Sequence, residues 1–215
     1  IDTTSLQMSP ATMSVPAGET GVCTVTLTAA EPGSFVDMLT LTMNDPFLPT
    51  LEIPVTATAI ISYNGPTWHV SVDAQYPYSN GSQDYPFASI QAGIDAASDG
   101  DTVLVSAGTY YENINYNSTK NINILSISGS EETIIDGSNN DTPVINFSNG
   151  DRYFKGFTVK GANAHSGIWC LNSNIVLEDL IIENNESEAI IKMSHWGVEK
   201  TISLNVMIAL SPLLN

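Results

Sequence analysis

The first sixty residues alternate between apolar and polar positions in short runs, which is the pattern of half-buried β-strands. In the runs 22–28, 38–43 and 51–57, apolar side chains fall mainly on one face and polar ones on the other. Glycine and proline residues separate the runs. Several short strands that each offer one apolar face predict a β-sandwich over residues 1–60.

One segment has the three- and four-residue spacing of an amphipathic helix. Its apolar positions are Phe87, Ile90, Ile94 and Ala97. The spacing predicts a single helix over 87–98. Ser89 or Asp84 is suited to cap its start, and Gly100 is suited to end it.

Beyond the helix, short strands rich in β-branched residues recur at a nearly constant interval. Ile145 and Ile168 are 23 residues apart, and Ile168 and Ile190 are 22 residues apart. Phe154 and Leu177 keep the same interval of 23. Two columns that share one interval predict stacked coils, each of which buries its inward side chains against its neighbours. The interval and the scarcity of helix favour a right-handed parallel β-helix with four to five coils.

The pattern divides the chain into four parts. Residues 1–60 form the sandwich, 61–67 a linker, and 68–193 the β-helix. After Met193 no further strand follows at the expected interval. We therefore expect residues 194–215 to be an irregular or truncated tail that is poorly ordered.

Four motifs in the repeating part are specific enough to indicate a family. They are YPFASIQAGIDAA from Tyr85, DGDTVLV from Asp99, GTYYENI from Gly108 and TIIDG from Thr133. Together they resemble the opening of the pectin-lyase-like right-handed β-helix superfamily over about residues 68–193. The resemblance implies that the helix caps the open end of the first coil. It implies no single reaction, because this superfamily contains lyases, hydrolases, esterases, adhesins and stalks.

The first part carries a second resemblance. VPAGETG from Val15, VTLTA from Val25, LTLTMNDP from Leu39 and LEIPVTATA from Leu51 are its motifs. They resemble bacterial immunoglobulin-like modules of the ASPM/SPD-2/Hydin type over about residues 5–59. The resemblance implies a partial module whose first strands are absent, and such modules serve as spacers or binding platforms.

The charge of the chain limits its partners. It has 23 Asp plus Glu against 6 Lys plus Arg, a net charge of −17. This acidity argues against nucleic acid and anionic membrane surfaces, which require basic patches. No apolar run reaches the length of a membrane span, so we expect no membrane insertion. We expect a monomer that is secreted or attached to the cell surface.

The two cysteines, Cys23 and Cys170, lie in strand-like runs of different predicted domains. We expect two buried free thiols. An inter-domain bridge or a reactive thiol are the alternatives.

No catalytic residue is assigned. Pectin methylesterases have the most similar opening, and they use a Gln, two Asp and an Arg on the coils after a strand like Gly156-Phe-Thr-Val. Here Ser166-Gly-Ile-Trp stands where that family has its Gln, and the one arginine, Arg152, precedes the expected site.

Three strand ends align to place Asp136, Lys160 and Glu183 in one outward column, with neighbouring coils about 4.8 Å apart. Asp136 and Glu183 are candidate ligands of a Ca²⁺ ion, the one cofactor the sequence suggests. Lys160 is a candidate substrate-binding or basic residue. The alternative is a solvated charge ladder without function, and two carboxylates beside Lys160 would keep it protonated.

Tyr153 and Trp169 are candidate platforms for a sugar ring, or they pack at coil edges. We therefore expect a secreted or cell-surface bacterial protein that binds or presents polysaccharide without catalytic residues in this chain. One alternative is the N-terminal part of a Ca²⁺-dependent, pectate-lyase-like polysaccharide lyase or of a glycoside hydrolase, with its catalytic coils outside this sequence. The other is a structural stalk or adhesin.

Overall fold

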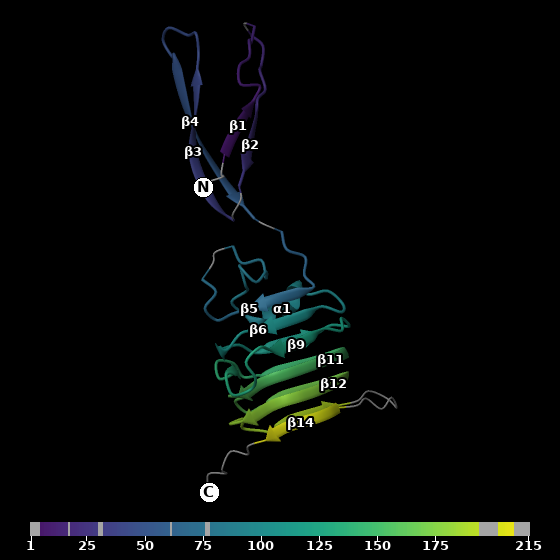
Figure 1. Ribbon diagram of the computed structural model, residues 1–215. Helices are drawn as coiled ribbons and strands as arrows, with labels where there is room; N and C mark the ends of the chain where they lie inside the picture. The colour runs from purple at the N-terminus through teal and green to yellow at the C-terminus, as the bar shows by residue number, and fades with distance from the viewer. Residues whose placement is uncertain are drawn as a thin grey trace. The chain divides into compact units, whose positions relative to one another are not determined.

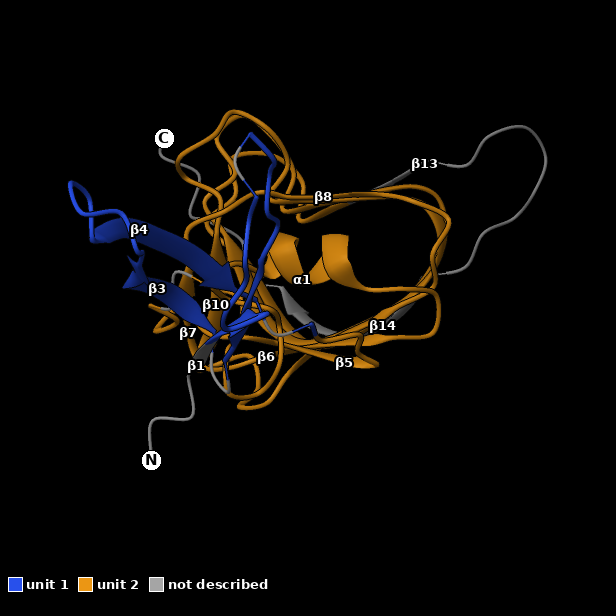
Figure 2. Cartoon of the chain, turned by 90° about the horizontal axis from the view of Figure 1, so that it is seen from above, with its two compact units in different colours: residues 1–62 blue, residues 63–215 orange. Residues whose placement is uncertain are grey.

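The structure is a computed structural model that describes residues 5–16, 18–29, 32–60, 62–75, 78–193 and 202–208. The chain divides into two compact units, residues 1–62 and 63–215, which Figure 2 distinguishes by colour. The first unit holds two small antiparallel sheets, and the second holds a large curled parallel sheet with one short helix. The predicted all-β class and the single helix are therefore confirmed.

Each small sheet of the first unit has two strands. β1 (Ser5–Ser9) pairs with β2 (Thr24–Thr28), and β3 (Gly33–Thr42) pairs with β4 (Thr50–Ala59). The Asp45 carboxylate shapes the turn between β3 and β4 by accepting hydrogen bonds from the Phe47 and Leu48 amides. Among the side chains described between residues 7 and 60, none is buried. The apolar runs thus form strands here without enclosing a core.

The cysteines differ in burial. Neither forms a disulfide bond, and Cys170 is buried in β12 as predicted. Cys23 is only half-buried, so the prediction of two buried thiols is wrong for this residue. The physical reason is that none of the described side chains between residues 7 and 60 is buried, so they enclose no core around Cys23.

The second unit is built on parallel pairing. Its strands are β5 (Thr67–Val70), β6 (Thr102–Val105), β7 (Gly108–Tyr110), β8 (Ile114–Asn117), β9 (Asn123–Ser126), β10 (Thr133–Asp136), β11 (Ile145–Lys160), β12 (Ile168–Glu183), β13 (Ile190–Met193) and β14 (Ile202–Ile208). Figure 1 shows β5, β6, β9, β11, β12 and β14 following one another as neighbours. The predicted columns are in register: Ile145 pairs with Ile168, and Ile168 pairs with Ile190.

The two long strands bend at matched positions. β11 and β12 each contain 16 residues, and left-handed residues interrupt both. In the register of the two strands, Asn149 (φ 59°) of β11 matches Asn172 (φ 52°) of β12. Gly156 (φ 84°) of β11 likewise matches Asp179 (φ 51°) of β12. Asn and Asp tolerate this conformation better than other residues with a Cβ atom. Asn184 (φ 52°) adopts the same left-handed conformation directly after β12.

These bends divide each long strand into three segments. In β11 the first segment (145–148) pairs with β8, the second (151–155) pairs through residues 153–155 with β9, and the third (157–160) pairs through residues 158–160 with β10. β11 therefore pairs with three separate strands, β8, β9 and β10. We call each such turn of the stack a level.

Inward side chains stack across the levels. Val103, Ile124, Phe154 and Leu177 follow one another in register, and all four are fully buried. The Phe154 ring also stacks on Phe157, with 4.5 Å between the ring centroids. Complete burial of such a side chain contributes roughly 1.5–3 kcal/mol. The core therefore lies inside the curled sheet and grows by one layer per level.

Helix α1 (Ile90–Ala96) is shorter than the predicted 87–98. Ser89 caps it, and its Oγ accepts a hydrogen bond from the Ala92 amide. The buried faces of Ile90 and Ile94 pack against the sheet, where the helix contacts β5, β6 and β8. Viewed from above in Figure 2, α1 lies within the outline that the strands form.

Residues from later loops hold both helix ends. The Glu112 carboxylate accepts hydrogen bonds from the amides of Ile90 (2.7 Å) and Gln91 (3.0 Å). The Lys120 ammonium donates to the carbonyls of Ile94 (3.1 Å) and Ala97 (2.6 Å). Free amides at a helix start and free carbonyls at its end both need such partners.

Residues 202–208, which the sequence assigns to an irregular tail, form strand β14. β14 pairs in parallel with β12, and Leu204 lies opposite Leu177, 27 positions earlier. The interval is longer than in the preceding repeats, which explains why the pattern did not predict this strand. The rest of the predicted tail, 194–201 and 209–215, lies outside the described residues.

Candidate functional site

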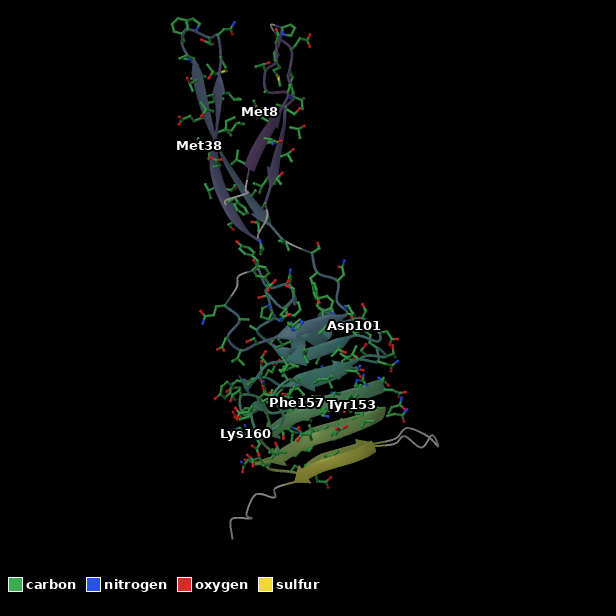
Figure 3. The ribbon with its side chains drawn as sticks, viewed as in Figure 1. Met8, Met38, Asp101, Tyr153, Phe157 and Lys160 are labelled. Atoms are coloured by element: carbon green, nitrogen blue, oxygen red, sulfur yellow. The ribbon has the colours of Figure 1, made fainter. Side chains whose placement is uncertain are left out.

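The predicted sugar-binding residues occupy three different segments of the long strands. Trp169 lies in the first segment of β12, Tyr153 in the second segment of β11, and Lys160 in the third. The left-handed residues between the segments keep the three side chains apart, and Figure 3 labels Tyr153 and Lys160 at separate places on the sheet. The structure does not bring these three candidates together.

The predicted charged column is present. Asp136 pairs in register with Lys160, and Lys160 with Glu183. The Lys160 Nζ atom lies 3.6 Å from Asp136 Oδ2. Burial acts to raise the pKa of Asp136, but hydrogen bonds from Ser138 and the nearby Lys160 outweigh it and lower that pKa. Asp136 is therefore an ionised partner of Lys160 at neutral pH.

The Ca²⁺ site stays a prediction. Within the part of the chain that the structure describes, no three side chains of His, Cys, Asp or Glu come close enough to hold a metal ion together. Asp136 and Glu183 share a column but have Lys160 between them.

A second cluster lies on the outside of the second segments. Tyr153 and Lys155 are two residues apart on β11, and Glu178 lies opposite Lys155 on β12. The Tyr153 hydroxyl donates to Glu178 Oε2 (2.6 Å), and the Lys155 ammonium donates to Glu178 Oε1 (2.7 Å). One carboxylate thus holds an aromatic and a cationic side chain in fixed positions. We call these three residues the Tyr153 cluster.

The hydrogen bonds fix the ionisation states in the Tyr153 cluster. The bond from Lys155, followed by that from Tyr153, lowers the pKa of Glu178. The bond to Glu178 in turn raises the pKa of Tyr153 and the pKa of Lys155. At neutral pH the carboxylate is charged, the ammonium is charged and the phenol keeps its proton.

The Tyr153 cluster is part of a wider surface. Side chains alternate across a strand, so those beside the buried Val103, Ile124, Phe154 and Leu177 point outward. We call this set the outer β-surface; it comprises Thr102, Leu104, Asn123, Leu125, Tyr153, Lys155, Val176 and Glu178. It places hydroxyl, amide and aromatic groups beside aliphatic side chains on neighbouring parallel strands.

Lys155 and Glu178 were not predicted to form a common site. Both follow the 23-residue interval that identified Phe154 and Leu177. Applying that interval to polar positions would have paired them. Trp169, by contrast, is half-buried beside Asn146 in the first segments.

The one arginine has a structural position. Arg152 is buried, and its guanidinium lies 4.0 Å from the centre of the Tyr116 ring. It donates hydrogen bonds to the carbonyls of Ser118 (2.5 Å) and Ser148 (3.1 Å) and to the Ser173 hydroxyl (3.4 Å). Burial lowers the pKa of Arg152. The side chain therefore ties three successive levels together from inside.

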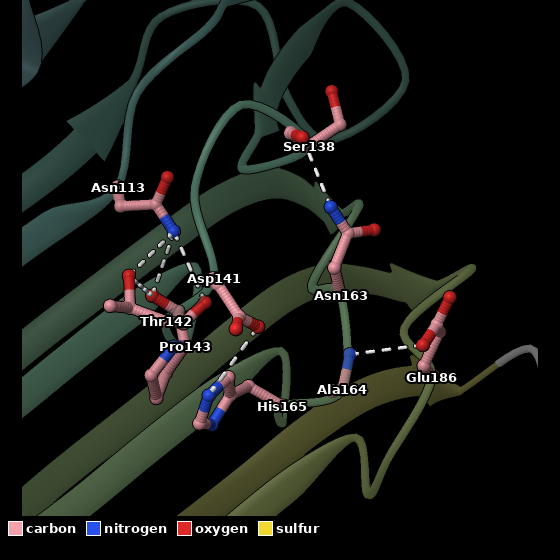
Figure 4. A network of polar contacts seen from close by, with 9 residues as sticks. All are labelled: Asn113, Ser138, Asp141, Thr142, Pro143, Asn163, Ala164, His165 and Glu186. Atoms are coloured by element: carbon pink, nitrogen blue, oxygen red, sulfur yellow. Dashed lines mark hydrogen bonds and ion pairs between the residues drawn. The ribbon is translucent and has the colours of Figure 1, made fainter.

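A further polar network joins the loops that follow the third segments (Figure 4). Asn163 donates to the Ser138 carbonyl (3.1 Å), and the Ala164 amide donates to the Glu186 carboxylate (3.0 Å). His165 Nε2 lies 3.7 Å from Asp141 Oδ1, and the His165 side chain is 43% exposed. These contacts connect one loop to the next, and they give the Glu186 carboxylate a structural role as a hydrogen-bond acceptor.

No known family model matches the chain, and no curated protein matches it. Among the described residues, no helix is long and apolar enough to cross a membrane.

Proposed function

We propose that the chain is part of a secreted or surface-attached bacterial protein that binds neutral polysaccharide on the outer β-surface. We further propose that residues 68–193 belong to the right-handed, pectin-lyase-like type of β-helix, and that the first unit is a partial immunoglobulin-like module. The Tyr153 cluster carries the functional proposal, because it holds an aromatic ring beside fixed hydrogen-bonding groups.

This chemistry suits sugars. One face of a sugar ring is rich in C–H groups that pack on aromatic and aliphatic side chains, while its hydroxyls need donors and acceptors. Neighbouring strands lie about 4.8 Å apart. A sugar chain lying across the strands would therefore meet Asn123, Tyr153 and Val176 on successive levels.

The charge of the chain favours a neutral ligand. A net charge of −17 repels polymers of uronic acids, whereas uncharged sugars meet no such repulsion. Lys155 is the described cation on the outer β-surface, and Glu178 already neutralises it.

The surroundings of Lys155 and Lys160 also favour polysaccharide binding over the β-elimination that a lyase catalyses. A lyase needs a basic group that accepts a proton from the sugar. The hydrogen bond to Glu178 raises the pKa of Lys155, and Lys160 lies beside Asp136. Lys155 therefore holds its proton, which supports the non-catalytic hypothesis over the lyase alternative.

The test is affinity electrophoresis of the full chain in gels containing neutral plant or bacterial polysaccharides or uronate polymers. We expect retardation by a neutral polymer and about a tenfold loss of affinity in Tyr153→Ala, the effect of removing one stacking ring. Tyr111→Ala is the matched control, because Tyr111 is an exposed tyrosine of the same unit outside the outer β-surface. Equal loss in both variants would contradict the proposal, and so would the release of unsaturated uronates with Ca²⁺ present.

A further inference from the structure

The sheet formed by β3 and β4 is incomplete as a folding unit. Each strand has ten residues, and among the described strands neither pairs with a third. An isolated two-stranded sheet is only marginally stable in water. It gains stability from an added strand or from packing against another element.

Both faces of this sheet expose aliphatic side chains. Leu51 and Ile53 on one face are 39% and 37% exposed, and Val36 on the other face is 76% exposed. Met38, labelled in Figure 3, lies on the same side as Val36 and is 50% exposed. Apolar exposure on both faces of one sheet is typical of a surface that receives a partner.

The two edges of the sheet are not equivalent. β4 contains Pro54, opposite Met38 on β3, and proline has no amide hydrogen to donate. Proline inside a strand is found with its nitrogen on the open edge. β3 has no proline between Gly33 and Thr42, so its outer edge is the better acceptor of a new strand.

The charge around the sheet selects the partner. The first 62 residues contain no lysine or arginine. Asp37 lies on the face of Ile53, and Glu52 lies on the opposite face. A second copy of the chain would bring the same negative charges, whereas a basic segment would be attracted to either face.

We propose that the outer edge of β3 binds an extended segment of another protein in which aliphatic residues alternate with lysine or arginine. The segment would add a third strand through main-chain hydrogen bonds. Alternation puts its aliphatic side chains on one face and its cations on the other. The aliphatic side chains would extend the row of Val36 and Met38, and the cations would lie near Asp37 on the opposite face. This proposal concerns the first unit alone and is independent of glycan binding.

The test uses the full chain and a synthetic ten-residue peptide that alternates valine and lysine, the length of β3. We expect saturable binding and slower amide hydrogen exchange confined to Gly33–Thr42. A peptide that alternates valine and glutamate should bind at least about tenfold more weakly, because its charges repel those of the sheet. A peptide with the same valines and lysines in two blocks should give no protection, since it cannot match the alternation of a strand.

Variants then locate the contact. Asp37→Asn should weaken binding of the valine–lysine peptide several-fold, whereas Glu52→Gln, on the face of the peptide's valines, should weaken it less. Asp141→Asn, which changes an exposed carboxylate of the other unit, should leave it unchanged. Equal binding of the block peptide or protection outside β3 would overturn the proposal. Dimers of the chain that bury the β3 edge, detected by sedimentation and exchange, would identify a second copy as the occupant and also overturn it.

Discussion

At the scale of single residues, position rather than residue type decides what each polar side chain does. Lys155 and Lys120 are both lysines, but one holds a surface carboxylate and the other caps a helix. Arg152 donates to carbonyls inside the sheet, where a guanidinium needs several acceptors to offset its lost hydration. Composition alone therefore assigns none of these roles.

The Tyr153 cluster gives a direct test at this scale. Glu178→Ala removes the acceptor whose hydrogen bond raises the pKa of Tyr153, so that pKa should fall toward the ordinary tyrosine value of about 10. Alkaline ultraviolet titration measures the shift, and Tyr153→Phe identifies the signal. Asp141→Ala should not move it, and a Tyr153 signal that stays high in Glu178→Ala would show that another group raises the pKa.

The same cluster has a defined response to acid. Its hydrogen bonds lower the pKa of Glu178, so they form whenever the pH is above the ordinary glutamate range. They are lost only as the pH falls through the lowered pKa of Glu178. A glycan affinity that depends on this cluster should therefore persist to mildly acidic pH and decline below it.

At the scale of elements, the matched left-handed residues define where each strand turns. Asn149 Nδ2 donates to Asn117 Oδ1 (3.0 Å), and Asn172 Nδ2 donates to Asn149 Oδ1 (3.1 Å). These amides form a ladder across three levels at the first bend. The ladder and the left-handed backbone both favour asparagine at this position.

Substitution of Asn149 separates these two effects. Asn149→Ala should destabilise the protein by about 2–3 kcal/mol, since it loses ladder hydrogen bonds and places a methyl group at a positive φ. Asn149→Gly loses the same bonds without that backbone strain, so its loss should be about 1 kcal/mol smaller. Urea denaturation of both variants measures the difference. Equal losses would show that backbone strain does not contribute.

The elements also show which parts of the fold are predictable. The columns through Ile145 and Phe154 were predicted because inward side chains must repeat wherever levels stack. Ser89 was one of two residues predicted to cap the start of α1, and it is the N-cap. The bounds of the helix were not predicted, since Glu112 and Lys120 bind its ends from loops far along the sequence. Of the Tyr153 cluster, only Tyr153 was predicted as a site residue. Lys155 and Glu178 were not, because outward residues need not repeat from level to level and so leave no regular pattern.

At the scale of the whole molecule, negative charge dominates. All six lysines and arginines follow residue 119, so the first unit carries acidic residues without cations. The ion pairs of Lys155 and Lys160 neutralise only a small part of the total. Repulsion between like charges therefore acts against the folded state.

Screening should relieve this repulsion. Raising NaCl to about 0.5 M shortens the range of electrostatic interactions to a few ångströms. We expect the midpoint of thermal unfolding to rise by several degrees, measured by circular dichroism. A lower midpoint in salt would mean that attractive ion pairs outweigh the repulsion.

The matched bends of β11 and β12 also determine where the second unit tolerates changes in length. A deletion between Asn149 and Gly156 would move one bend away from its counterpart in β12 and expose Phe154. The loops after the third segments impose no such restriction: nine positions separate Asp136 from Ile145, eight separate Lys160 from Ile168 and seven separate Glu183 from Ile190, while the flanking strands stay in register. Short insertions and grafted peptides should therefore be tolerated best at 163–164 and 186–188, whose side chains are exposed, with the loss of the hydrogen bond from Ala164 to Glu186.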